Sequence, residues 1–246
     1  MDDVIAIIPA RSGSKSVKDK NIALVSDVPL IAYSIAAAQL SKRISRVIVS
    51  TDSERYAELS MRFGAEVPFL RPSNIARDRS TDREWLFHAI NWINENETYL
   101  PEYWVHLRPT TPLRSPEVID KAIAALIADR EATALRSAHK APESPAKWFR
   151  KGSDGYVKTL IDDSDGKEIF NLPRQLFPNV YIPDGYVDII KTSHILNQST
   201  LYGQRLLFFE SPVCTEIDSQ EELEYIQYQI SKHGSTLLDH IVRNHL

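Results

Sequence analysis

The sequence predicts an α/β protein built on a doubly wound, mostly parallel β-sheet. Short apolar runs rich in β-branched residues, at 4–8, 47–49 and 104–107, lack polar alternation, which is typical of strands buried on both faces. A segment with helical spacing or a helix-capping pattern follows each run. This alternation of strands and helices over the first 130 residues is what a parallel sheet with crossover helices requires.

Capping patterns place the helices. Proline suits a first helical turn, and Ser or Thr followed three residues later by Glu forms a capping box, as at Thr81 and Ser219. We expect helices from about Pro29, from Asp52 or Ser53 to about Phe63, from Thr81 to about Ile93, from Ser115 to about Ala128, and from Ser219 to about Lys232.

Residues 138–184 break this rhythm with many prolines, glycines and charges. They are the natural place for an inserted arm, a lid or an oligomerisation element within a single domain spanning 1–246. Strand-like runs resume at 186–190 and 205–209.

Composition excludes several classes of protein. The 246 residues are 43% hydrophobic and 25% charged, with a net charge of −4, which argues against global disorder and against a nucleic-acid or membrane-surface binder. Cys214 is the single cysteine, so neither an intrachain disulfide nor a cysteine metal cluster is expected. An acidic start, Met1-Asp2-Asp3, and the absence of an apolar run of about 18 residues lead us to expect a cytoplasmic protein.

The loop after the first strand, residues 10–21, is the strongest local signal. It carries cations, hydroxyls and Gly13, at the sheet edge where doubly wound proteins bind ligands. Backbone amides in such a turn form an anion site, although neither a Walker phosphate loop nor a dinucleotide-binding glycine pattern is present. The alternative is a solvated basic loop.

Two further features carry oxygen ligands. Glu216 and Asp218 alternate in extended chain, so both carboxylates point to one side, an arrangement that Mg²⁺ prefers together with substrate phosphates. The alternative is that Glu216 faces water and Asp218 only precedes a helix. Residues 109–112, with two prolines and two threonines, predict a rigid polar loop at the same sheet edge, or a plain connection.

Six segments in order resemble a known family. They are Ile-Pro-Ala-Arg-Ser-Gly-Ser-Lys at 8–15 with Lys20-Asn21, Val-Ser-Thr-Asp at 49–52, Phe-Leu-Arg-Pro at 69–72, Pro-Thr-Thr-Pro-Leu-Arg at 109–114, Pro-Arg-Gln and Pro-Asp-Gly at 173–175 and 183–185, and Glu-Ile-Asp at 216–218. Over about residues 4–230 the chain is similar to the acylneuraminate cytidylyltransferases, or CMP-sialic acid synthetases. The resemblance implies a nucleotide-diphospho-sugar transferase-like fold.

The resemblance also implies a reaction: CMP passes from CTP to the anomeric hydroxyl of a 3-deoxy-2-ulosonic acid, and pyrophosphate leaves. The residues expected to hold the nucleotide are Arg11, Lys15 and Lys20 at the triphosphate, Ser12, Gly13 and Ser14 as amide and hydroxyl donors, Asn21 at the pocket wall, and Arg71 and Ser80 near cytosine. Arg11, Lys15, Lys20 and Asp218 are the expected catalytic groups, since cations and Mg²⁺ meet the charge that develops on pyrophosphate.

The metal motif departs from the family pattern. Asp218, with Glu216, would hold Mg²⁺, but the family has aspartate where this chain has Glu216. The extra methylene moves the carboxylate by roughly 1.5 Å, one C–C bond. Glu216 would then bind through water, or one of two metals would be lost.

The acid site also departs from the family pattern. By resemblance it includes Arg108, Thr110, Arg174, Gln175 and Asp184, but the sialic-acid members carry glutamine and asparagine where this chain has Arg108 and Asp184. The two charged residues either pair with each other or recognise a differently substituted acid. In the second case N-acetylneuraminate is a poor substrate and a legionaminate-like, pseudaminate-like or amino-bearing acid a better one.

The family forms dimers through an inserted arm, which predicts a homodimer through residues 138–184. Two other functions stay open: a sugar nucleotidyltransferase with another base or acid, and a non-catalytic nucleotide-binding protein.

Overall fold

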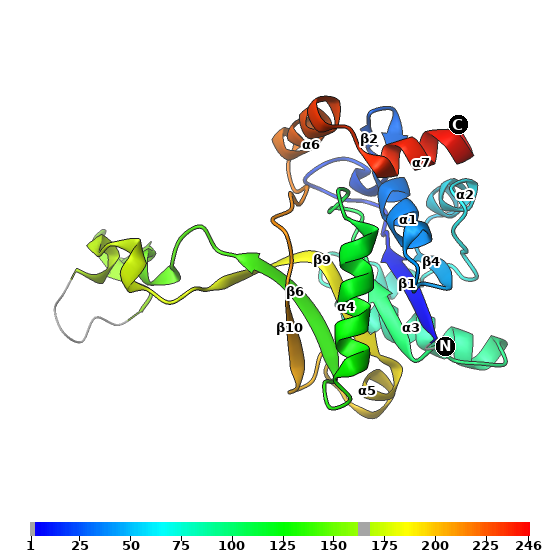
Figure 1. Ribbon diagram of the computed structural model, residues 1–246, viewed down its shortest axis with the longest axis horizontal. Coiled ribbons are helices and arrows are strands. Elements are labelled where there is room, and N and C mark those ends of the chain that lie inside the picture. Colours follow the sequence, from blue (N-terminus) through cyan, green and yellow to red (C-terminus); the bar gives the residue numbers. More distant parts are fainter. Residues whose placement is uncertain (1–2, 162–167) are drawn as a thin grey trace.

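A six-stranded mixed sheet forms the centre of the molecule in a computed structural model, which describes residues 3–161 and 168–246 (Figure 1). The strand order is β10-β6-β9-β5-β1-β4. Its strands are β1 (Val4–Pro9), β4 (Arg46–Ser50), β5 (Tyr103–His106), β6 (Ala134–Lys140), β9 (Tyr181–Lys191) and β10 (Leu206–Glu210). Parallel pairs join β1 to β4 and β5, and β10 to β6, whereas β9 runs antiparallel between β5 and β6. The predicted α/β class with a mostly parallel sheet is confirmed, with one antiparallel strand at its middle.

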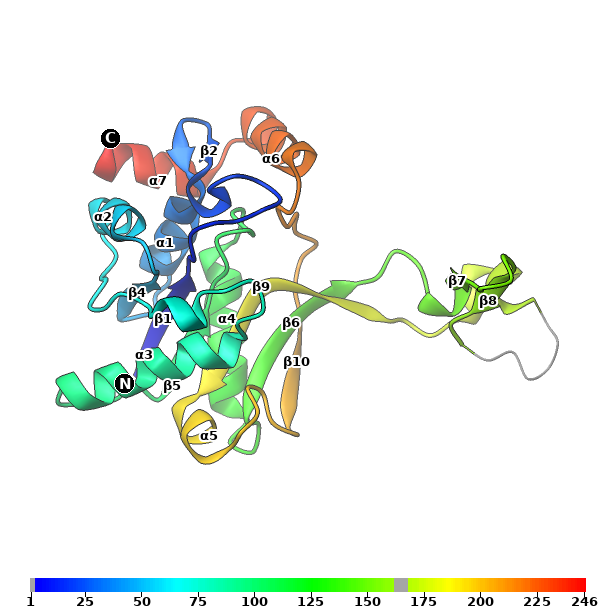
Figure 2. The same cartoon turned by 180° about the vertical axis from the view of Figure 1, so that it is seen from behind.

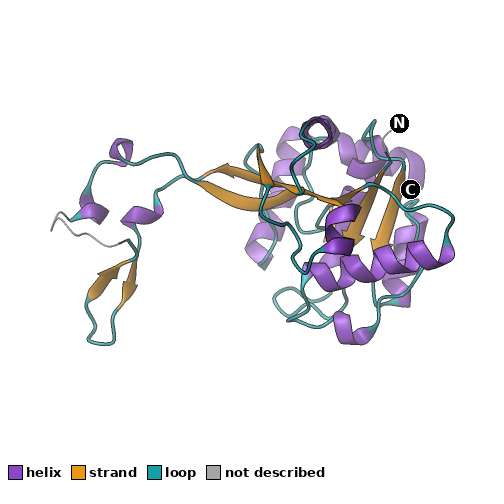
Figure 3. Ribbon diagram, turned by 90° about the horizontal axis from the view of Figure 1, so that it is seen from below, coloured by secondary structure: helices purple, strands orange, loops and turns teal. Residues whose placement is uncertain are grey.

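Helices cover both faces of this sheet (Figure 3). They are α1 (Leu30–Leu40), α2 (Glu54–Arg62), α3 (Asp82–Asn96), α4 (Pro116–Ala128), α5 (Thr192–Asn197), α6 (Gln220–His233) and α7 (Thr236–His245). Alternate side chains of β1 point to opposite faces. Ile5 and Ile7 pack with residues of α3 and α5, whereas Ala6 and Ile8 belong to the core formed with α1, α4, α6 and α7. The doubly wound arrangement therefore follows from a first strand that is apolar on both sides.

The helix starts agree with the capping patterns. Thr81 and Ser219 form capping boxes, and the hydroxyls of Ser53 and Ser115 each accept a backbone N–H of the first turn. The prediction for the first helix was one residue out, because Pro29 lies at the N-cap and not inside α1.

Of the sheet strands and α-helices named above, β6, α5 and α7 were not predicted. Strand β6 contains Arg136, Ser137 and His139, so it lacks an apolar run. Helix α7 follows Gly234, the residue that ends α6, and its Leu237 and Ile241 are buried in the core.

An arm projects from the sheet (Figures 1 and 2). Its root is a ribbon made by the far ends of β6 and β9, which pair as far as Lys140 and Tyr181. Beyond the ribbon lie 3-10 turns and a hairpin of β7 (Phe149–Lys151) and β8 (Val157–Thr159). The predicted irregular stretch 138–184 thus starts and ends inside sheet strands; its residues 162–167 lie outside the described part of the chain.

Within the described ranges, no helix is long and apolar enough to cross a membrane.

Candidate active site

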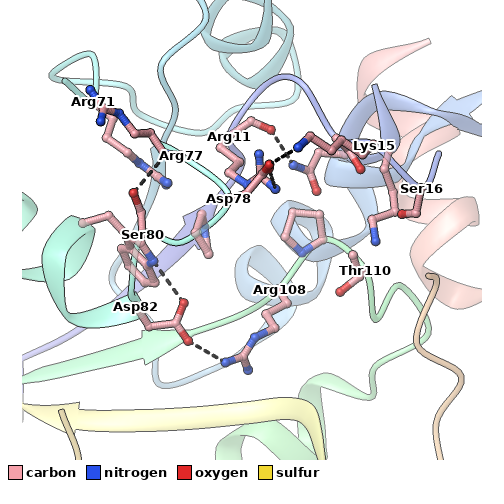
Figure 4. A pocket seen from close by; sticks show the side chains of 16 residues that line it. Arg11, Lys15, Ser16, Arg71, Arg77, Asp78, Ser80, Asp82, Arg108 and Thr110 are labelled. Carbon is pink, nitrogen blue, oxygen red and sulfur yellow. Dashed lines mark hydrogen bonds and ion pairs between the residues drawn. The ribbon is translucent and has the colours of Figure 1, made fainter. Parts of the chain in front are cut away.

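The carboxyl ends of β1 and β5 open onto a cavity of about 470 Å³, shown close up in Figure 4. This is the edge at which doubly wound sheets bind ligands. The lining residues are Pro9, Arg11, Ser14, Lys15, Ser16, Lys20, Asn21, Arg71, Arg77, Asp78, Ser80, Asp82, Trp85, Arg108, Pro109 and Thr110. The fold therefore brings together most of the predicted nucleotide residues, from segments far apart in the sequence.

The loop after β1 is held in shape by its own polar groups. Gly13 has φ 71°, a left-handed conformation that favours glycine. The Asn21 side chain donates to the Arg11 carbonyl at 2.9 Å and so ties the two ends of the loop together. Ser12 donates to the Asp52 carboxylate from its backbone N–H at 2.7 Å and from its hydroxyl at 2.8 Å. Ser12, predicted to donate to the nucleotide, instead anchors the loop to the residues after β4 and does not line the cavity.

Carboxylates pair with the cations of this loop. Arg11 and Lys15 both contact Asp78, at 3.0 and 2.5 Å, and Lys20 contacts Asp218 at 2.8 Å. The Lys15 ammonium, which hydrogen-bonds to Asp78, holds the pKa of that carboxyl below its usual value. The Lys15 side chain is 82% exposed, whereas that of Lys20 is 13% exposed. The basic loop is thus a structured set of ion pairs facing a cavity, and not a solvated coil.

Glu216 and Asp218 flank a buried residue, Ile217, whose N–H donates to the Thr110 carbonyl at 2.8 Å. The Thr110 hydroxyl donates to Glu216 at 3.1 Å. This backbone contact fixes both carboxylates beside the cavity. Their oxygens suit a Mg²⁺ ion that also binds phosphates, and Lys20, itself a cation, would then have to leave Asp218 for a phosphate oxygen. Among the described residues, no group of three or more His, Cys, Asp or Glu side chains could hold a metal; magnesium binding by two carboxylates stays a prediction.

Arg71 and Ser80 line the cavity, at the end predicted to face the base. Arg71 is 5% exposed and donates to Ser50, at 2.6 Å to its carbonyl and 3.1 Å to its hydroxyl. Burial lowers the pKa of Arg71 to about 10, and the charges of Asp52 and Asp82 oppose that effect, so the guanidinium stays charged at neutral pH. The Ser80 hydroxyl accepts the Arg77 N–H at 2.9 Å.

Arg108 forms the opposite end of the cavity. Its guanidinium donates to Asp188 at 2.9 Å and to Asp82 at 2.8 Å. Burial lowers the pKa of Arg108, but the two carboxylates outweigh burial and hold it above its ordinary value. Pairing of Arg108 with Asp184, one of the two alternatives from the sequence, is therefore wrong.

Asp184 lies in a closed hydrogen-bond network away from the cavity. Its carboxylate accepts from the hydroxyls of Ser137, at 2.7 Å, and Ser211, and from the Tyr186 N–H at 3.0 Å. It is 4% exposed and does not line the cavity. The reason is local: the β6–β9 register shifts between Arg136 and Ala138, next to Gly185 at φ 61°. Because of this irregularity, Asp184 and Asp188 meet different partners although they lie on the same strand: Asp184 binds Ser137, and Asp188 binds Arg108.

Arg174 and Gln175 lie on the arm. They line a second cavity of about 360 Å³, which shares no lining residue with the first. Arg174 donates to the Ala141 carbonyl at 3.5 Å. A single chain therefore does not bring these two predicted acid-binding residues to the site.

Sequence reasoning missed the acidic residues of the site: Asp52, Asp78, Asp82 and Asp188. Asp82 was interpreted only as part of a capping box. The one available signal was Asp188, a charged residue inside the apolar run at 186–190, where a buried strand should have none.

Comparisons with known proteins agree with this geometry. The profile of the Cytidylyltransferase family matches residues 5–229. An N-acylneuraminate cytidylyltransferase of Escherichia coli is 29% identical over 90% of this chain, and a flagellin modification protein B of Campylobacter coli is 28% identical over 94%. The chain spans 50% of the length of the first relative and 97% of the second.

A solved structure shares the fold. A CMP:2-keto-3-deoxy-manno-octonic acid synthetase in complex with CTP superposes with a TM-score of 0.68 at 15% identity, covering 94% of this chain and 99% of that one.

The fold and the cation-lined cavity define a nucleotide-binding α/β transferase class. The chain belongs to the cytidylyltransferase family, a family of enzymes, and the resemblance to its acylneuraminate members is confirmed.

Proposed function

We propose that this protein transfers CMP from CTP to the anomeric hydroxyl of a nonulosonic, sialic-acid-like acid and releases pyrophosphate. One observation carries the proposal. The cations of the β1 loop and Arg108 line one cavity, so groups suited to a triphosphate and a group suited to an acidic sugar face the same space.

The loop cations have the role of binding the triphosphate. Arg11, Lys15 and Lys20 reach the cavity from three points of one turn, and each is paired with a carboxylate that phosphate oxygens can replace. Positioned cations stabilise the negative charge that builds up on departing pyrophosphate. Asp218 and Glu216 would hold Mg²⁺, which supplies further charge stabilisation when bound.

We propose that Arg108 determines the specificity for the acid substrate. It offers only hydrogen-bond donors, whereas the glutamine of the sialic-acid family pattern offers a donor and an acceptor. We therefore propose that N-acetylneuraminate is a poor substrate and that a differently substituted acid is preferred. Relatives of this chain are named for other acids: a CMP-N,N'-diacetyllegionaminic acid synthase of Legionella pneumophila is 36% identical over 49% of this chain.

The arm is proposed to form a homodimer. Among its described residues, Trp148, Phe149 and Leu176 are 45%, 58% and 66% exposed, more apolar surface than a solvated loop needs. Arg174 and Gln175 would then reach the partner's cavity. A monomeric mass in solution at micromolar concentration would contradict this proposal.

The decisive experiment is a substrate panel read by pyrophosphate release. The four nucleoside triphosphates, each with Mg²⁺, are combined with a set of ulosonic acids. Release with CTP and a nonulosonic acid is the expected result. Preference for another base would point to a different sugar nucleotidyltransferase, and tight CTP binding without turnover on any acid would point to a non-catalytic protein.

A further inference from the structure

Asp188 is a charged residue at the centre of the molecule. It lies on β9, the middle antiparallel strand, and its side chain is 0% exposed. Its Oδ2 atom accepts from Arg108 Nη1 at 2.9 Å and from the Tyr202 hydroxyl at 2.9 Å. Arg108 in turn lines the cavity. Asp188 therefore touches the cavity only through Arg108.

Stability does not explain a carboxylate at this position. Burying a charge costs free energy, and a buried ion pair is often no more stabilising than apolar residues of the same volume. The flanking residues of β9, Val187 and Ile189, are apolar and fully buried in the core. Apolar residues in place of both members of the pair would serve the fold as well, so the pair points to a task other than stability.

The structure holds the Arg108 guanidinium from three sides. Asp188 and Asp82 accept from its two terminal nitrogens, and such bonds to a planar guanidinium fix its orientation as well as its place. Gly185 leaves room for it: a Cβ there would lie 3.2 Å from Arg108 Cδ and 3.3 Å from Nη1. Arg108 is thus preorganised, with donors left over for a ligand.

Charges of both signs surround this arginine. Arg136 Nε lies 3.9 Å from the second oxygen of Asp188, and the buried Arg114 donates to the Arg108 carbonyl at 2.7 Å, so three arginines lie close to the two carboxylates. His106 adds no charge, because burial and then Arg108 hold its pKa well below its usual value. The free donors of Arg108 can therefore bind an acceptor oxygen of the acid.

We propose, on the basis of the function above, that Asp188 is a positioning residue that aims Arg108 at an acceptor oxygen of the acid. Asp188 makes no contact with either substrate. We expect its effect to fall on the acid more than on the triphosphate, because Arg11 and Lys15 pair with Asp78 and Lys20 pairs with Asp218.

The test is Asp188→Asn, which keeps the shape and removes the charge. The KM for the best acid should rise by about tenfold, the scale of one charge-assisted hydrogen bond, while the KM for CTP changes by less than about twofold. Tyr202→Phe removes only the second bond to the same oxygen and should give a smaller rise, of about threefold. Asp120→Asn is the control, because Asp120 binds Ser41 and the Lys42 N–H far from the cavity and should change neither KM.

A double-mutant cycle separates positioning from general damage. In an Arg108→Gln background, Asp188→Asn should add little to the KM for the acid, because the residue it acts through is gone. Additive losses, or equal rises in both KM values, would overturn the proposal. So would a Tyr202→Phe variant with unchanged acid KM, a measurement that remains if Asp188→Asn fails to fold.

A direct measurement of acid binding distinguishes failure of this inference from failure of the proposed function. Calorimetric titration of each acid, with a non-hydrolysable CTP analogue present, gives a Kd without turnover. If the wild type releases no pyrophosphate but binds an acid, the proposed function fails, and the cycle is read on Kd instead. If no acid binds, the inference fails too.

Discussion

The two ends of the cavity hold their cations in opposite ways. At the phosphate end, Lys15 and Lys20 pair with Asp78 and Asp218, carboxylates whose side chains are 43% and 71% exposed. At the other end, Arg108 pairs with Asp188, which is fully buried. Exposed ion pairs contribute about 0–1 kcal/mol, so they break easily when phosphate arrives. Buried, hydrogen-bonded pairs are costly to break on one side.

In the proposed reaction, the phosphate end therefore exchanges partners, whereas the acid end keeps a fixed geometry. A triphosphate brings its own negative charge, so its cations need carboxylate partners only while CTP is absent. A hydrogen bond to an acceptor oxygen of the acid is directional, so the arginine that donates it has to be aimed beforehand.

The largest effect is expected at Asp218. Asp218→Asn, nearly isosteric, should lower kcat by about 10² or more, since it removes a charge-stabilising group together with the Lys20 partner. Initial rates across a Mg²⁺ titration measure it. Glu224→Gln, an exposed carboxylate change on α6, is the matched control and should leave the rates unaltered. Near-normal, Mg²⁺-dependent activity of Asp218→Asn would show that the metal assignment is wrong.

The second effect separates position from charge in the β1 loop. Lys20→Ala should lower kcat by about tenfold or more and raise the CTP KM less, if Lys20 meets charge that develops late in the reaction. Lys18→Ala removes the same charge from a residue that does not line the cavity, and should be tolerated. Equal damage at both positions would mean that the loop acts by charge alone.

The elements predicted from the sequence are those whose signals lie in a few adjacent residues. Examples are the capping boxes at Thr81 and Ser219 and the apolar strand β1. Strand β6 could not be predicted, because Ser137 and His139 turn toward partners on β9 and not toward a core. These polar side chains form hydrogen bonds with Asp184 on the neighbouring strand, and that pairing is not visible in the sequence.

The site divides in the same way. The β1 loop was predictable because its cations are adjacent and follow a strand. Asp184 and Asp188 are four residues apart on one strand, and only the bulge near Gly185 decides which of them reaches Arg108. Motif resemblance favoured Asp184, whereas geometry places Asp188 beneath the cavity. Pairing across distant segments is a tertiary property that neither spacing nor composition reveals.

The third effect concerns the choice of acid. Arg108→Gln restores the residue of the sialic-acid family pattern and should shift kcat/KM toward N-acetylneuraminate by about tenfold relative to the best wild-type acid. Competition between the two acids at fixed CTP measures the shift. Asp184→Asn, which restores the second family residue outside the cavity, should produce no shift and a lower Tm. A shift toward N-acetylneuraminate in Asp184→Asn but not in Arg108→Gln would show that Asp184, and not Arg108, determines the choice of acid.

The smallest effect is expected at Asp78. Because Asp78 competes with phosphate for Arg11 and Lys15, Asp78→Asn should lower the CTP KM by up to about fivefold, the range of an exposed ion pair of about 1 kcal/mol. The gain should shrink as salt rises, since salt screens exposed charges. Asp154→Asn, which breaks an exposed pair with Lys158 on the arm, is the control and should leave the CTP KM unchanged. A higher CTP KM in Asp78→Asn would mean that Asp78 holds Arg11 and Lys15 in their binding positions, and the contrast between an exchanging end and a fixed end would fail.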